Sequence, residues 1–198
     1  MRILIGTPIH EVKNYAIERW LANVSQLEYP ADLLMVDNSP GLKYMEKVKG
    51  YCAKYRLKNY KIHHFEIDQK LGPDIRIEAS QEMLRQYVLS HDYDAWFSWE
   101  CDQIIPPNAL DKLIKLMAGG DYMMVVHNSW ARWDSTILNT NMGITLITKE
   151  CLEKCLFLPQ KRGRDVNDPT VFKKRVLSSG GHYLEVFGVI KPIYHLDS

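Results

Sequence analysis

The sequence predicts a single-domain α/β protein with a mostly parallel, mixed central sheet flanked by helices. Short apolar runs alternate with longer amphipathic segments over the first ~120 residues, which is typical of a parallel sheet covered on both faces. The chain has 198 residues, 46% hydrophobic and 25% charged, enough for one well-buried core. No linker rich in Gly, Ser or Pro divides it.

The first half is expected to alternate strictly between strands and helices. Short apolar runs bounded by polar residues predict strands, and apolar residues three and four apart predict helices. Asp74 is placed to cap the third helix, and Pro106 and Pro107 stop the fourth strand. In order, the expected elements are a strand at 1–6, a helix at about 12–26, a strand at 33–36, a helix at about 42–55, a strand at 61–66, a helix at about 74–90, a strand at 95–99 and a helix at about 108–117.

The second half is less regular. Pro169 suits the first turn of a helix, and Gly180 and Gly181 suit its end. The expected elements are a strand at 121–127, a strand at 143–147, a short helix to about 156, a loop at 159–168, a helix at about 169–179 and a strand at 183–189.

Composition and charge exclude several functional classes. The formal net charge is +1, from 25 basic and 24 acidic residues, and no basic stripe with interleaved aromatics indicates nucleic-acid binding. Four cysteines do not make a disulfide framework at this length. No signal-peptide pattern and no apolar run of the ~18 residues that a membrane span needs is present, so we expect a cytoplasmic protein. Basic clusters at 161–164 and 173–175 leave weak peripheral membrane contact open, and a homo-oligomer is open too.

Two acids follow a mostly apolar run, Ala95 to Trp99. Glu100 and Asp102 come where this buried strand runs out of the sheet, and open α/β sheets bind ligands at that edge. Carboxylate oxygens suit Mg²⁺ or Mn²⁺, which are held by one or two carboxylates together with phosphate oxygens. The alternative is a strand end that is polar only because it meets water. The Asp92-Tyr93-Asp94 sequence precedes the strand and is therefore expected at the opposite edge.

Other strand ends are expected beside this acid pair. Thr7 and Pro8 follow the first strand and Asp37 follows the second, so all should meet at one edge of a parallel sheet. A carboxylate such as Asp37 accepts hydrogen bonds from a base or ribose. No glycine-rich phosphate loop is present, so a metal, Lys or Arg would have to hold a nucleotide's phosphates. Arg76 is a candidate, although it could equally be a solvated helix charge. The histidines at positions 10, 63 and 64 are expected to be structural.

The order of these motifs resembles the GT-A class of nucleotide-sugar glycosyltransferases, above all its inverting, family-2-like members. The resemblance covers the first ~120 residues and, more loosely, the rest. It is carried by the segments 3–8 (ILIGTP), 34–39 (LMVDNS), 96–102 (WFSWECD) and 104–107 (IIPP).

The resemblance implies roles for single residues. Asp37 matches the acid that binds the nucleotide's base. Glu100 and Asp102 match the Asp-x-Asp signature, with Glu100 facing the ribose and Asp102 the metal, although Glu replaces the first Asp. His195 matches a late histidine that completes the metal site, the alternative being a surface histidine near the terminus. Residues 1–120 would bind the nucleotide sugar and residues 121–198 the acceptor.

The resemblance also implies a general base at the start of a late helix. The segment 165–175 (DVNDPTVFKKR) resembles the family pattern, with Asp168 fitting best and Asp165 second. As a helix cap alone, Asp168 would be fully explained. Trp130 and Gly143 would border the acceptor, and Trp130 could equally be a core or dimer contact.

These inferences predict a glycosyltransferase dependent on Mn²⁺ or Mg²⁺. It would move a sugar from a nucleoside-diphosphate donor to a hydroxyl of a carbohydrate, glycan, or protein- or lipid-linked acceptor, with inversion implied by the resemblance. A sugar nucleotidyltransferase and a non-catalytic nucleotide- or sugar-binding module are the alternatives.

Overall fold

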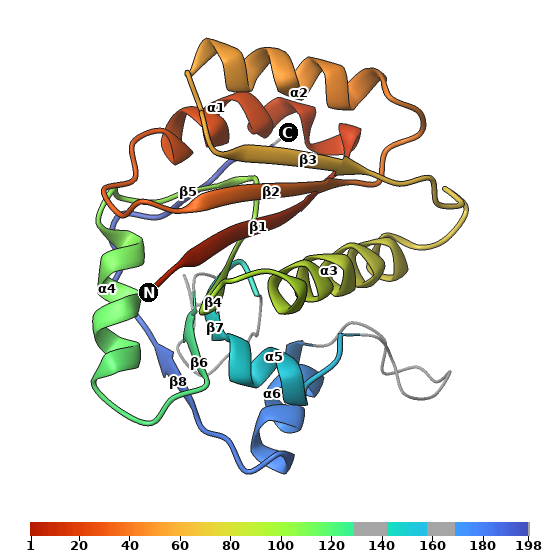
Figure 1. Cartoon of the computed structure of the whole chain (residues 1–198). Coiled ribbons are helices and arrows are strands. Elements are labelled where there is room, and N and C mark those ends of the chain that lie inside the picture. The colour runs from red at the N-terminus through yellow and green to blue at the C-terminus, as the bar shows by residue number, and fades with distance from the viewer. Residues whose placement is uncertain (129–141, 158–168, 198) are drawn as a thin grey trace.

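The structure is a computed structural model that describes residues 1–128, 142–157 and 169–197. Its central sheet has seven strands in the order β3-β2-β1-β4-β7-β6-β8 (Figure 1). Among these strands, β7 is the one that runs opposite to the rest, antiparallel to both β4 and β6. The predicted mostly parallel, mixed sheet is therefore confirmed. The strands are β1 (Ile3–Ile9), β2 (Asp32–Asp37), β3 (Tyr60–His64), β4 (Ala95–Trp99), β6 (Met124–His127), β7 (Ile144–Thr148) and β8 (Tyr183–Val186).

Helices cover both faces of the sheet, because alternate side chains of each strand point to opposite faces. One face is covered by α1 (Asn14–Val24), α2 (Lys43–Lys54) and α4 (Ala109–Ala118), and its core includes Ile5, Trp20 and Phe97. The other is covered by α3 (Pro73–Ser90), α5 (Lys149–Lys154) and α6 (Pro169–Ser178), and its core includes Leu4 and Leu84. Figure 1 shows α1 and α2 on one side of β1–β3 and α3 on the other. None of the helices described is long and apolar enough to cross a membrane.

Helix α1 is held against the carboxyl end of β4. The rings of Trp20 and Trp99 pack with their centroids 5.1 Å apart. The amide of Asn23 bonds the backbone of Ile105 twice, as a donor at 2.9 Å and as an acceptor at 2.8 Å. These contacts hold the second half of α1, which follows the 3₁₀ turn η1 (Glu11–Lys13), against β4 and the segment after it.

Strand β1 continues beyond its predicted end at residue 6. Thr7 and Pro8, predicted in a loop, lie within the strand and pair with Met35 and Val36 of β2. Strand β4 pairs with β1 only as far as Gly6, so the last part of β1 has a neighbour on one side. A proline, which has no amide hydrogen, is tolerated at such a one-sided position.

A second, two-stranded sheet joins the segment after β4 to the last residues of the chain. Its strands β5 (Gln103–Ile104) and β9 (Tyr194–His195) are antiparallel, with Gln103 opposite His195. Strand β5 was not predicted, because two residues are too few for a periodic pattern. Strands β3 and β8 end earlier than predicted, at His64 and Val186.

Candidate functional site

A pocket of about 410 Å³ lies at the carboxyl ends of β1, β2 and β4. This is the edge at which open α/β sheets bind ligands. Elements from across the chain line it: the end of β1, η1, the residue after β2, the first turns of α3 and the segment after β4. Its residues are Thr7, Pro8, Ile9, His10, Val12, Lys13, Asn38, Pro73, Arg76, Ile77, Gln81, Ser98, Trp99, Glu100, Cys101, Asp102 and Met142.

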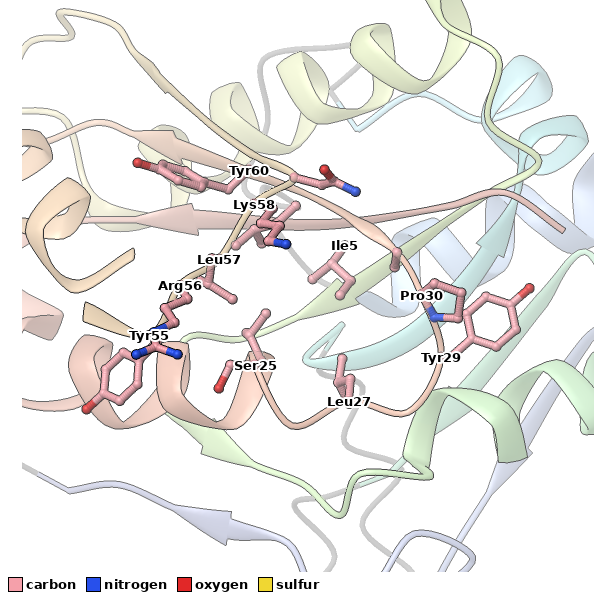
Figure 2. A pocket seen from close by; sticks show the side chains of 14 residues that line it. Ile5, Ser25, Leu27, Tyr29, Pro30, Tyr55, Arg56, Leu57, Lys58 and Tyr60 are labelled. Carbon is pink, nitrogen blue, oxygen red and sulfur yellow. The ribbon is translucent and has the colours of Figure 1, made fainter. Parts of the chain in front are cut away.

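A second cavity, of about 250 Å³, lies at the opposite edge of the sheet (Figure 2). Ile5, Leu27 and Leu57 line it together with the residues that precede β2 and β3. It faces the amino ends of the strands, away from the predicted site residues.

The carboxylate of Asp102 is paired with a cation at the rim of the first pocket. Its Oδ2 accepts a hydrogen bond from Nζ of Lys13 and lies 3.5 Å from the hydroxyl of Tyr15. The side chain of Asp102 is 12% exposed and that of Lys13 41%. Partial burial works to lower the pKa of Lys13, but the hydrogen bond and charge of Asp102 outweigh it and raise this pKa. The pair is therefore an ammonium facing a carboxylate.

Glu100 directly follows β4 and lines the same pocket as this pair. Burial, and then the negative charge of Asp102, raise the pKa of Glu100 to about 7. Its Oε2 accepts a hydrogen bond of 2.7 Å from Nε2 of Gln103. Its backbone amide donates a 2.9 Å hydrogen bond to the carbonyl of Gly143, so Gly143, predicted on the acceptor side, touches the first acid of the pair.

His195 lies next to the Asp102 segment in the structure, and its role as a metal ligand stays a prediction. It pairs with Gln103 across the small sheet, and the amide of Leu196 donates a 2.8 Å hydrogen bond to the carbonyl of Asp102. No group of three or more His, Cys, Asp or Glu side chains forms a metal site in the part of the chain that the structure describes. Asp102 nevertheless fits Mg²⁺ or Mn²⁺, because its oxygen already faces a positive charge at the pocket rim and these ions take most of their ligands from phosphate and water.

Asp37 ends β2 but is buried beneath the pocket. Its Oδ2 lies 2.9 Å from Nδ1 of His64, and its Oδ1 accepts a 3.0 Å hydrogen bond from the amide of Ser39. Both oxygens are thus bonded within the protein, and the neighbouring Asn38 lines the pocket instead. Contact between Asp37 and a nucleotide base stays a prediction.

Arg76 points its guanidinium into a polar network at the pocket. Its Nη1 lies 2.7 Å from Nε2 of His10 and 2.5 Å from Oε1 of Gln69. His10, expected to be structural, therefore belongs to the pocket wall. The structure brings five of the predicted donor-side residues to this one pocket: Thr7, Pro8, Arg76, Glu100 and Asp102.

Three predicted residues, Trp130, Asp165 and Asp168, lie outside the described residues. Lys13 and Gln81 line the pocket and were missed by sequence reasoning. We expected a Lys or Arg to bind the phosphates, but no local motif in the sequence distinguishes Lys13 from the other lysines.

No protein-family model and no curated protein matches the sequence. Solved structures do match in fold. The mannosyltransferase PcManGT from Pyrobaculum calidifontis, in complex with GDP-Man and Mn²⁺, has a TM-score of 0.70 at 14% identity over 95% of this chain and 55% of that one. S. aureus TarS in complex with UDP-GlcNAc has a TM-score of 0.65 at 12% identity over 94% and 56%. The glycosyltransferase GlyE of Streptococcus pneumoniae TIGR4 has a TM-score of 0.59 at 10% identity over 93% and 45%. The chain thus spans about half the length of each of these three structures.

Proposed function

We propose that this chain, which has the GT-A fold of nucleotide-sugar glycosyltransferases, is itself a glycosyltransferase using a nucleoside-diphosphate sugar. The observation that carries the proposal is the position of Asp102: its carboxylate faces a cation at the rim of a pocket formed by the carboxyl ends of β1, β2 and β4. Two structures of the same fold are described as complexes with GDP-Man and with UDP-GlcNAc, which supports a donor of this class.

The pocket residues suit the parts of such a donor. Arg76 supplies positive charge for phosphate oxygens. Glu100 and Asp102 face the ribose and the metal, and Asp37 supports the base from beneath the pocket. Mn²⁺ or Mg²⁺, held by Asp102 and His195, would neutralise the charge that develops on the leaving diphosphate.

The acceptor hydroxyl needs a group that takes its proton. We assign this role to Asp168, with Asp165 as the second candidate, and inversion at the sugar carbon follows from attack opposite the leaving group. Trp130 and Gly143 are assigned to the acceptor side of the pocket. The acceptor is a hydroxyl of a carbohydrate, a glycan, or a protein- or lipid-linked sugar.

Incubation with Mn²⁺ and a panel of UDP- and GDP-linked sugars tests the proposal. A glycosyltransferase releases nucleoside diphosphate and free sugar slowly when no acceptor is present. Turnover that requires pyrophosphate would instead show a nucleotidyltransferase. Binding of donors in the absence of metal and without any turnover would show a binding module.

A further inference from the structure

Lys13 pairs with the same carboxylate, that of Asp102, to which we assign the metal ion. Its ammonium donates to Oδ2 of Asp102 and lies 3.2 Å from the hydroxyl of Tyr15. Among the described residues, neither side chain has another ion pair, so the ammonium supplies the local charge balance for the carboxylate.

The position of Lys13 is built into the fold. His10, at the end of β1, caps the turn η1 through the 3.2 Å hydrogen bond from the amide of Val12 to its Nδ1. Lys13 ends this turn. The contacts of Trp20 with Trp99, and of Asn23 with Ile105, hold α1 against the segment that carries Asp102. The cap of η1 and the buried contacts of α1 together hold the two charged groups near each other.

The same ammonium can reach the donor side, because Lys13 and Asp102 line one pocket with Arg76. A nucleoside diphosphate carries several negative oxygens, and an ammonium on a flexible stem turns readily from one anion to another. Nearly half of the Lys13 side chain is exposed, so no packed core has to open for it to move.

We propose that the ammonium of Lys13 is the counter-ion of Asp102 in the free protein. A divalent cation must displace this ammonium to bind Asp102, and a bound nucleoside diphosphate attracts the ammonium to its phosphates. The proposal rests on the proposed donor site, because the nucleotide supplies the phosphate oxygens. Divalent cation and nucleotide then bind cooperatively, since each favours the same arrangement of Lys13. The free protein binds the cation weakly, and the pocket acquires its metal together with its donor.

Binding of Mn²⁺ to the nucleotide-free protein tests this directly, by electron paramagnetic resonance of the unbound ion. Lys13→Met should bind Mn²⁺ up to about fivefold more tightly than the parent protein, because the ion pair that competes with the metal is partly exposed and such pairs are weak. Lys13→Arg keeps the charge and should bind as weakly as the parent. The matched control is Lys54→Met. Lys54 lies outside the pocket, and its Nζ is 2.5 Å from Oε1 of Glu18, so its replacement should leave Mn²⁺ affinity unchanged.

A second titration, with UDP or GDP present, measures the cooperativity. Nucleotide should tighten Mn²⁺ binding more in the parent than in Lys13→Met. Equal Mn²⁺ affinity of Lys13→Met and the parent protein in the nucleotide-free state would overturn the proposal, as would equal tightening by nucleotide in both. Failure of every nucleoside diphosphate to bind the parent protein would instead overturn the proposed function, while the nucleotide-free comparison would still decide the role of Lys13.

Discussion

The backbone amide of Glu100 donates a 2.9 Å hydrogen bond to the carbonyl of Gly143, which joins the end of β4 to the start of β7. A Cβ atom at position 143 would lie 2.5 Å from Nε2 of Gln103 and 2.8 Å from Oε2 of Glu100. The glycine therefore lets the backbone approach the acid pair as closely as it does.

Gly143→Ala should displace Glu100 and Gln103 and weaken nucleotide binding. Forcing an extra methyl group into such a contact typically costs about 1–3 kcal/mol, which thermal unfolding would detect. Gly50→Ala is the matched control: apart from the backbone of its own helix, no atom would lie within 4 Å of the new Cβ, and the change should stabilise helix α2 by about 0.5–1 kcal/mol. A Gly143→Ala protein as stable as the parent, with unchanged nucleotide affinity, would contradict the close approach.

Glu100 should make the metal-free protein less stable as pH rises. Its pKa is about 7 in the folded protein, against an ordinary glutamate value of 4.5. Between these values the unfolded chain has lost the proton that the folded protein still holds, so the free energy of unfolding falls with pH and levels off above pH 7. The loss from this one group is on the order of 3 kcal/mol.

Glu100→Gln removes this titration and should stabilise the protein at pH 8 much more than at pH 5. Urea unfolding in the presence of a chelator at both values measures the difference. A Glu100→Gln protein whose stability relative to the parent is the same at both pH values would show that Glu100 ionises normally.

Asp37 and His64 should stabilise the ends of β2 and β3 in a pH-dependent way. Burial works to lower the pKa of His64, but hydrogen bonds to Asp37 and Glu66 outweigh it and raise this pKa above 6.5. The stabilisation is therefore fully present below pH 6.5 and lost as pH rises through the folded pKa. Asp37→Asn should cost about 1–3 kcal/mol at pH 6 and less at pH 9.

Glu66→Gln is the control for this pair, because its carboxylate also contacts His64 but its side chain is 73% exposed. It should change the unfolding free energy little at either pH. An Asp37→Asn protein that loses nucleotide affinity but no stability would instead show that Asp37 acts on the base.

Asp168→Asn should slow sugar transfer by about 10²–10⁴-fold and leave donor binding unchanged, because a general base acts on the acceptor's proton. Asp165→Asn tests the second candidate in the same assay. Full turnover in both variants would exclude both acids as the base.

Most strands of the sheet could be predicted from the sequence, because their apolar residues form short runs that are bounded by turn-forming or polar residues. The Asp92-Tyr93-Asp94 sequence was correctly predicted to lie at the edge of the sheet opposite to Glu100 and Asp102. It precedes β4, and Oδ2 of Asp94 accepts a 2.6 Å hydrogen bond from the amide of Arg2. The strand direction of β7 is not visible in its sequence. The extension of β1 through Pro8 also depends on tertiary structure, since it requires β4 to leave the ladder at Gly6.

The sequence predicted the site residues that follow the ends of strands. It did not predict the contacts between side chains that are far apart in the sequence. Asp102 and Arg76 follow recognisable strand and helix boundaries and do line one pocket. The partnership of Lys13 with Asp102 joins residues separated by 89 positions, and that of Asp37 with His64 joins two neighbouring strands. Such pairs depend on register and packing, which single-sequence periodicity does not encode.

Calorimetric titration of UDP and GDP, with and without Mn²⁺, into the parent protein and into Asp102→Asn tests the central claim most directly. Asp111→Asn, which removes an exposed carboxylate paired with Lys115 at 2.6 Å, is the matched control. We expect at least one nucleotide to bind the parent and Asp111→Asn more tightly when Mn²⁺ is present, and Asp102→Asn to lose that gain. Equal enhancement by Mn²⁺ in Asp102→Asn and the parent would contradict the assignment of Asp102 as the carboxylate that holds the metal beside the donor's phosphates.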